Sequence, residues 1–166
     1  MHSRIIDKVS AMRHRFSLLA PLLAPLLLAG CVNDTASYQI DGKDHALTVR
    51  VVQDYFWSKE GTVRLTASRM PDCLRQMDMG ELPLSGLEIE LFASGPNLYT
   101  LRAGEDTWQV ETAGCTQLEA PEADAVTGQA LGVFHLDANK KLQFEAAEGA
   151  GGAPAADTGS TTEAAS

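Results

Sequence analysis

The chain has 166 residues, a length that allows one domain. It contains 22 acidic and 13 basic side chains, which give a formal net charge of −9. This acidity argues against nucleic acid or an anionic membrane surface as an electrostatic partner, because both repel a negatively charged protein. A cationic protein or a divalent cation matches the charge better, although solubility alone would also explain it.

The first 30 residues have the three parts of a signal peptide. Arg13 and Arg15 supply the basic start, Leu18–Leu28 supplies the apolar run, and Ala29-Gly30 supplies small residues at the cleavage point. A translation start at Met12 would give the leader a more usual length. The apolar run is shorter than the roughly 20 residues of a membrane-spanning helix and contains two prolines, so we expect an export signal.

The leader ends in Leu28-Ala29-Gly30-Cys31. This motif resembles the lipobox of bacterial lipoproteins, in which an aliphatic residue, a small residue and a glycine or alanine precede the cysteine that takes the lipid. The resemblance implies that Cys31 becomes the mature N-terminus and carries an N-acyl diacylglycerol, which anchors the protein on a bilayer almost irreversibly. We expect no cofactor besides this lipid. Val32 stands where enterobacterial lipoproteins of the inner membrane have aspartate, which implies anchoring in the outer membrane, facing the periplasm or, alternatively, the cell surface.

Four regions follow from this interpretation. We predict a signal peptide over 1–30, a lipidated tether over 31–37, a β domain over 38–146 and a disordered tail rich in Ala, Gly, Ser and Thr over 147–166, which has too few large apolar residues to fold. Removing the leader leaves nine basic and 21 acidic residues, so the mature protein has a net charge of −12.

Two cysteines remain after Cys31 is assigned to the lipid. Cys73 and Cys115 form an even pair in a compartment that is oxidising after export, so we expect a disulfide between them. A metal site would need further ligands at short spacing, and neither cysteine has them.

Apolar and polar residues alternate along most of the mature chain, which is typical of half-buried strands. Leu47, Val49 and Val51 share one face, and Val63, Leu65 and Ala67 share another. We predict a long hairpin over 38–68, further strands over 87–91, 98–102 and 107–112, and a last hairpin over 131–144. About seven or eight short strands predict an all-β fold, a small antiparallel barrel or sandwich.

Two segments interrupt the alternation. Pro71 to Leu84 predicts a short helical turn that carries Leu74 and Met77, and Thr116 to Thr127 predicts a loop. The expected disulfide would tie the first of these segments to the end of the strand 107–112.

Three consecutive aromatic residues, Tyr55, Phe56 and Trp57, lie near the tip of the first hairpin. Alternation would send Tyr55 and Trp57 to one face and Phe56 to the other, which makes them a candidate interaction surface for a peptide, a glycan or the bilayer. The alternative is cross-strand packing against Val63 and Leu65.

The sequence shows no catalytic or metal-binding constellation. No ligand stands at metal-site spacing from His45 or His135, so we expect structural or surface roles for both histidines and no enzymatic activity. From Asp78 to Ala125 the chain has ten acidic residues and one basic residue, Arg102. Such an acidic region is either a docking surface for a cationic partner or a solvated sheet face.

The segment Arg69-Met70-Pro71-Asp72-Cys73, followed by a later single cysteine, is similar to that of small uncharacterised lipoproteins of proteobacteria. The resemblance supports the disulfide and implies no activity. Our main hypothesis is an outer-membrane-anchored lipoprotein whose non-catalytic domain binds or supports another envelope component. Inhibitors of host lysozyme resemble this chain in size, charge and class, but their Ser-Gly-rich loop is absent. The alternative hypothesis is a small-ligand carrier or an enzyme with a site at a barrel mouth.

Overall fold

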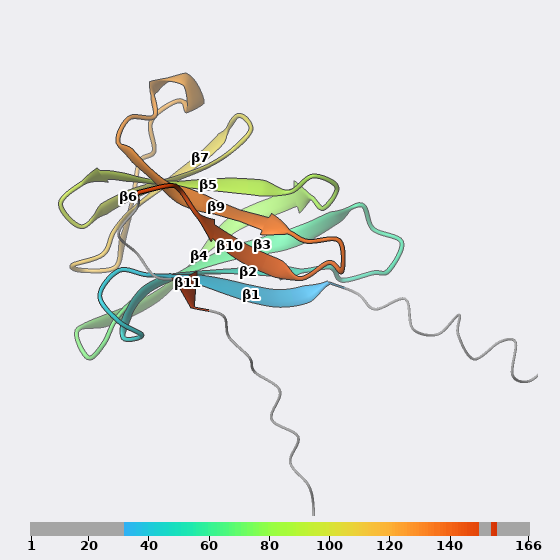
Figure 1. Ribbon diagram of the computed structural model, residues 1–166, viewed down its shortest axis with the longest axis horizontal. Coiled ribbons are helices and arrows are strands. Elements are labelled where there is room, and N and C mark those ends of the chain that lie inside the picture. Colours follow the sequence, from blue (N-terminus) through green and yellow to red (C-terminus); the bar gives the residue numbers. More distant parts are fainter. Residues whose placement is uncertain (1–31, 150–153, 156–166) are drawn as a thin grey trace, which may run out of the picture. The chain divides into compact units, whose positions relative to one another are not determined.

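A computed structural model describes residues 32–149 and 154–155 of the chain (Figure 1). The predicted signal peptide over 1–30, with Leu28, Ala29 and Gly30, lies outside the described residues, as do Cys31 and most of the predicted tail. Within the described residues there is no helix long and apolar enough to cross a membrane.

The described chain forms two antiparallel sheets, which confirms the all-β prediction. Sheet one has the order β11-β1-β2-β3-β4, formed by Pro154–Ala155, Asn33–Gln39, His45–Val52, Glu60–Arg69 and Cys73–Pro83. Sheet two has the order β10-β9-β5-β6-β7-β8, formed by Leu142–Ala146, Gln129–Leu136, Glu88–Gly95, Leu98–Ala103, Asp106–Glu111 and Thr116–Leu118.

Sheet one supplies about half of the core, and the alternating residues of β2 and β3 are the main part of that share. Val49 of β2 stands opposite Leu65 of β3, and Val51 stands opposite Val63. These side chains are buried, while the intervening Arg64 is exposed, as the period of two predicts. Burial of such aliphatic side chains is the main favourable term in folding, at roughly 1.5–3 kcal/mol each.

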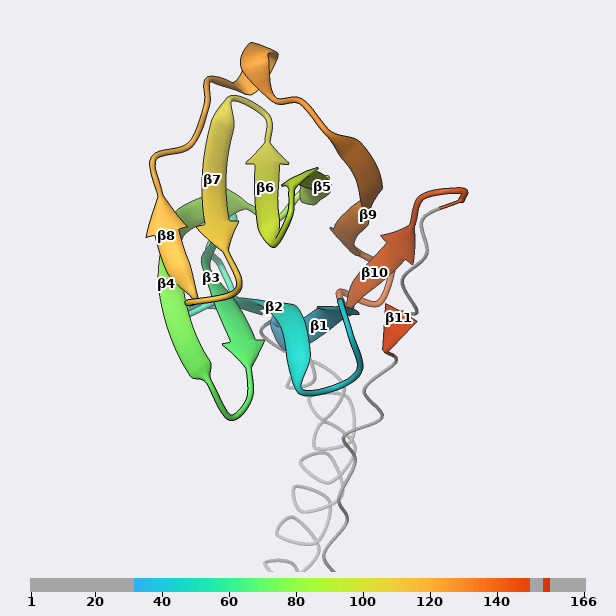
Figure 2. The ribbon, with the colours of Figure 1, turned by 90° about the vertical axis from the view of Figure 1, so that its left-hand side faces the viewer.

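Sheet two supplies the other half of the core, chiefly through Ile89, Leu91, Leu101 and Phe134, which are fully buried. Aromatic rings link the sheets, because Tyr38 of β1 lies 5.3 Å from Phe144 of β10 between ring centroids. Figure 2 shows the two sheets end-on, with β10 next to β1 on one side, where the two strands are in contact. On the other side the Cys73–Cys115 disulfide joins the first residue of β4 to the residue before β8. The fold is therefore a β-sandwich whose two sheets are linked on both sides.

Gly132 of β9 lets β10 approach closely. A Cβ atom at this position would lie 2.2 Å from the Glu145 carbonyl oxygen and 2.5 Å from the Phe144 ring. Its φ of +156° is also a conformation that other residues rarely adopt. Only glycine fits this crossing of β9 and β10.

The predicted helical turn over Pro71 to Leu84 is wrong, because most of this segment is β4. The strand pairs with β3 from Arg69 opposite Cys73 to Glu60 opposite Pro83. Its buried residues are Met77, Met79 and Leu82, whereas Leu74 is exposed. The i, i+3 spacing of Leu74 and Met77 therefore resembled a helical pattern without being one.

Three other boundaries differ from the predictions. The predicted tether over 31–37 is wrong from Asn33 onward, because β1 begins there and pairs with β2. The predicted loop over 116–127 contains β8 and a short 3-10 turn, η2 (Ala123–Ala125). Residues 154–155 of the predicted disordered tail form β11 on the edge of β1. These strands, with β4, explain why the described residues contain more strands than the seven or eight predicted.

Candidate functional site

The segment 53–59, which we call the aromatic loop, joins β2 to β3 and presents the three consecutive aromatic residues to solvent. The exposed fractions of Tyr55, Phe56 and Trp57 are 59%, 65% and 67%. The alternative interpretation, cross-strand packing of these residues against Val63 and Leu65, is therefore wrong. Their division between two sheet faces is also wrong, since β2 ends at Val52 and the alternation ends with it.

The aromatic rings pack on one another instead of on the core. Tyr55 and Trp57 stack with 5.1 Å between ring centroids, and Phe56 meets Trp57 edge-on at 4.7 Å. Such pairs are stabilised beyond the area that they bury. The three rings therefore form one compact apolar patch on the loop.

Gln53 holds the base of the aromatic loop to the first described residue. Its backbone N–H donates to the Val32 carbonyl at 2.7 Å, and its side-chain Oε1 accepts from the Val32 N–H at 3.3 Å. Its Nε2 donates to the Ser58 carbonyl at 2.6 Å, which closes the loop. Gln53 and Val32 are both buried, so the first described residue and the aromatic loop form one hydrogen-bonded unit.

A groove of about 410 Å³ opens beside this unit. Three connections converge on it, the aromatic loop, the β4–β5 connection and the β9–β10 turn, which gather on the right-hand side of Figure 1. Its apolar lining includes Val32, Phe56, Leu84 and Leu136, and its polar lining includes Gln53, Lys59 and Lys140.

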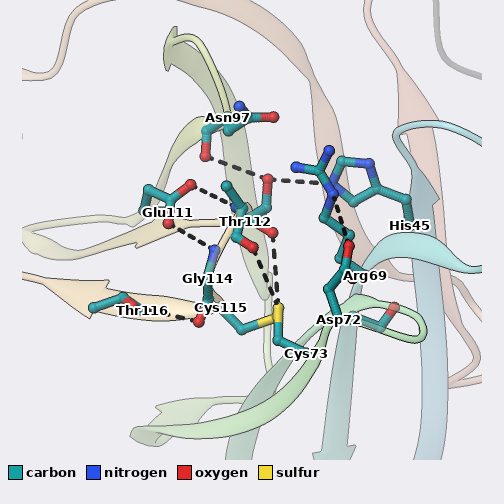
Figure 3. Close-up of a disulfide and its surroundings, with 12 residues drawn as sticks. His45, Arg69, Asp72, Cys73, Asn97, Glu111, Thr112, Gly114, Cys115 and Thr116 are labelled. Atoms are coloured by element: carbon teal, nitrogen blue, oxygen red, sulfur yellow. Dashed lines mark hydrogen bonds and ion pairs between the residues drawn. A yellow bond between two sulfur atoms is a disulfide. The ribbon is translucent and has the colours of Figure 1, made fainter.

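The disulfide, drawn in Figure 3, joins residues at the end of β3 and β4 opposite to the aromatic loop. Cys73 is bonded to Cys115, with 5.9 Å between the Cα atoms, which confirms the predicted pair. It joins the first residue of β4 to the turn between β7 and β8. The Glu111 carboxylate braces this turn by accepting hydrogen bonds from the N–H groups of Ala113 and Gly114.

His45 also links the two sheets, and Figure 3 shows its ring directed at Thr112. The ring Nε2 lies 3.2 Å from the Thr112 hydroxyl, and the Thr112 N–H donates to the Asn97 carbonyl at 2.8 Å. Burial and the Arg69 guanidinium lower the pKa of His45, and the Asp41 carboxylate opposes them. His135 lies on β9 opposite Gln143. Within residues 32–149 and 154–155, no group of three or more His, Cys, Asp or Glu side chains is arranged to hold a metal ion.

A second groove, of about 280 Å³, lies over the outer face of β5, β9 and β10, and we call it the acidic groove. Its apolar lining includes Phe92, Ala130, Val133 and Ala146, and its carboxylates belong to Glu90, Glu145 and Glu148.

Arg102 neutralises one of the three carboxylates of the acidic groove. Its guanidinium lies 2.6 Å from Glu90 and 5.2 Å from the centroid of the Phe92 ring. Glu145 and Glu148 are exposed. The sequence did not reveal this groove, because it needs the pairing of β5 with β9, about 40 residues further along the chain.

No protein-family model, no curated protein and no solved structure matches the chain. The features that bear on function are the motif Leu28-Ala29-Gly30-Cys31, the two grooves and the aromatic loop.

Proposed function

We propose that this protein is an outer-membrane-anchored lipoprotein whose non-catalytic β domain binds a basic component of the cell envelope. The anchor is the lipid on Cys31, at the end of the motif Leu28-Ala29-Gly30-Cys31. The domain faces the periplasm in this proposal, and cell-surface exposure is the alternative orientation.

One observation carries the proposal: Val32, which follows Cys31 in the sequence, is buried at the start of the β domain. The motif therefore directly precedes a residue that is built into the β domain, as expected if cleavage before Cys31 leaves the lipidated cysteine next to the domain. The disulfide between Cys73 and Cys115 supports export, since such bonds persist in oxidising compartments.

The acidic groove supports the binding role. An apolar floor with a few polar groups at its rim is the usual composition of a binding surface. The exposed carboxylates of Glu145 and Glu148 favour Lys or Arg side chains of a partner, and the mature charge of −12 favours a basic partner as a whole.

Acylation is tested by labelling cells with a radioactive or alkyne-tagged palmitate. The wild-type protein is expected to incorporate the label and to sediment with outer membranes in a density gradient. Cys31→Ser is expected to lose the label and to keep the leader, whereas Cys73→Ser with Cys115→Ser keeps the label. An unlabelled wild-type protein would contradict the lipoprotein assignment.

Binding is tested with a photo-crosslinking amino acid at Val133 in the full chain within native envelopes. We expect one basic protein to crosslink at this position and not at Arg64, which is exposed on the other sheet. The charge reversals Glu145→Lys and Glu148→Lys should remove the crosslink, while Glu119→Lys, outside the groove, should keep it. If neither charge reversal nor added salt reduces the crosslinking yield, the acidic groove is excluded as the binding site.

The groove beside Val32 favours a second candidate, a small-ligand carrier or an enzyme with its site at this end of the sandwich. Its apolar walls with convergent polar groups suit a small amphipathic molecule. A fluorescent apolar probe should then bind saturably, and Leu136→Trp, which fills the groove, should abolish that binding. Unsaturable or unchanged binding would dismiss this candidate.

A further inference from the structure

The three rings of the aromatic loop are an exposed apolar patch on an otherwise polar loop. Asp54 and Lys59, which flank the rings, are exposed and charged, and Ser58 is polar. Exposed aromatic clusters rimmed by polar residues mark contact surfaces for proteins or membranes. Of these two partners, the membrane fits the structure better.

The residue to which the lipid would be attached lies next to the aromatic loop. Cys31 is covalently bonded to Val32, and Val32 is hydrogen-bonded at both its N–H and its carbonyl to Gln53. Consecutive Cα atoms are about 3.8 Å apart, so the anchor lies one residue from the base of the aromatic loop. Tyr55 follows Gln53 by two residues, a span of at most about 7 Å.

The distance cannot be lengthened by a flexible linker, because β1 already begins at Asn33. A tether over 31–37 would have let the domain turn away from the bilayer. Without that tether, acyl chains on Cys31 hold this end of the sandwich at the membrane surface.

We propose that Tyr55, Phe56 and Trp57 insert into the interfacial layer of the bilayer that holds the lipid on Cys31. This proposal rests on the acylation of Cys31 proposed above. Aromatic side chains favour the headgroup level of a membrane, where the ring leaves water and the Tyr hydroxyl and the Trp N–H keep polar partners.

The net negative charge of the protein is not concentrated at this end. Lys59, Lys140 and Lys141 are exposed there and nearly balance the acidic residues Asp34, Asp54, Glu60 and Asp137. The lipid on Cys31 supplies the attachment, so the loop needs no attraction to anionic lipids. A mixed interface of aromatic rings and lysines is common at the membrane surface, because lysine stems can lie along the apolar layer with the ammonium in water.

The two tryptophans of the chain allow a direct test with the intact, acylated protein in phosphatidylethanolamine/phosphatidylglycerol vesicles. Trp108→Phe leaves Trp57 as the only tryptophan, and Trp57→Phe leaves Trp108, which is half-buried against the core. Brominated acyl chains quench only tryptophans that reach the bilayer. We expect bromolipid to reduce Trp57 emission at least about twofold and to leave Trp108 emission nearly unchanged.

An aqueous quencher provides the converse measurement. Acrylamide should quench Trp57 strongly in urea-unfolded protein and weakly in vesicles. The replacement of Met70 and Leu74 by serine in the Trp108→Phe background is the matched control, because these exposed apolar residues lie near the β3–β4 turn, at the other end of the strands. Bromolipid quenching of Trp57 should survive this control.

The outcomes separate this inference from the proposed function. If palmitate labels Cys31 but bromolipid does not quench Trp57, the lipoprotein assignment stands and the aromatic contact with the bilayer is wrong. If palmitate does not label the protein, both proposals fail. Quenching of Trp57 and Trp108 to the same extent would also overturn the inference, since it would indicate general insertion or unfolding at the vesicle surface.

Discussion

The carboxylate of Asp34 accepts a hydrogen bond from the backbone N–H of Leu142, 108 residues further along the chain, at 3.0 Å. Asp34 belongs to the part of β1 that β11 does not cover, and Leu142 begins β10, the edge strand of sheet two, so this bond joins the two sheets. The Lys141 ammonium lies 3.9 Å from the same carboxylate oxygen. Asp34 thus links β1 to β10, two strands that form no backbone ladder with each other in the described residues.

Asp34→Ala is expected to lower the free energy of unfolding by roughly 1–3 kcal/mol, because the Leu142 N–H loses a charged acceptor at a partly buried position. Urea denaturation followed by circular dichroism measures the change. Asp124→Ala, in the exposed η2 turn, is the control and should remain within about 0.5 kcal/mol of wild type. Equal stabilities of the two variants would show that Asp34 does not hold the sheet edges together.

The Cys73–Cys115 disulfide is expected to supply a large share of the stability. The two cysteines are 42 residues apart, and closing a loop of this length stabilises by about 4 kcal/mol in the chain-entropy model. Cys73→Ala with Cys115→Ala should therefore unfold at much lower urea concentration, and a reducing agent should reproduce the effect in wild type only. If reduction leaves the urea midpoint of the wild-type protein unchanged, the loop that the disulfide closes in the unfolded chain does not contribute to stability.

Gly132→Ala should disrupt the crossing of β9 and β10, since the added Cβ would lie 2.2 Å from a backbone oxygen that cannot move freely. We expect a loss of more than about 2 kcal/mol in unfolding free energy. Gly95→Ala is the matched control, because its added Cβ has nearest neighbours at 3.5 Å. Thermal unfolding of both variants distinguishes close approach from a general cost of replacing glycine.

His45 should make the protein less stable in mild acid. Its pKa in the folded protein is lowered from the ordinary value of 6.5 by burial and by Arg69. As the pH falls below about 6.5, His45 takes up a proton more readily in the unfolded chain than in the folded protein. The contribution of neutral His45 to the free energy of unfolding is therefore fully present above this pH and is lost as the pH falls through the lower pKa of the folded protein. His45→Gln keeps a polar group near Thr112 but does not titrate, so its melting temperature should fall less between pH 7.5 and pH 5. Parallel profiles for wild type and variant would refute this role.

Periodicity alone predicted the strands that have one apolar and one polar face. β2 and β3 are of this kind, and their buried residues Val49, Val63 and Leu65 were identified from spacing alone. The Cys73–Cys115 pair followed from cysteine number and the expected compartment, without knowledge of the fold.

Edge strands and turns were harder to predict because their conformation depends on contacts with residues that are distant in the sequence. Ser37 looked like part of a polar tether, yet its hydroxyl pairs with that of Thr48 on β2 at 2.8 Å. Gln53 follows the last residue of β2, where the alternation ends. Its side chain is held by a hydrogen bond to Val32, which lies 21 residues earlier in the chain. A pattern within one segment cannot encode such bonds. The sequence therefore predicted Tyr55, Phe56 and Trp57 as a candidate interaction surface, whereas the acidic groove and the exposure of all three rings on one loop emerged only from the fold.

The direct start of β1 after Val32 also limits the reach of the protein. A strand rises about 3.3 Å per residue, so the ten residues of β3 span roughly 33 Å from the aromatic loop toward the disulfide end. A domain anchored at Cys31 with no spacer would stay within about this distance of its own membrane. Any partner that binds the sandwich would then have to come within that distance of the membrane, because the protein could not stretch out to meet it.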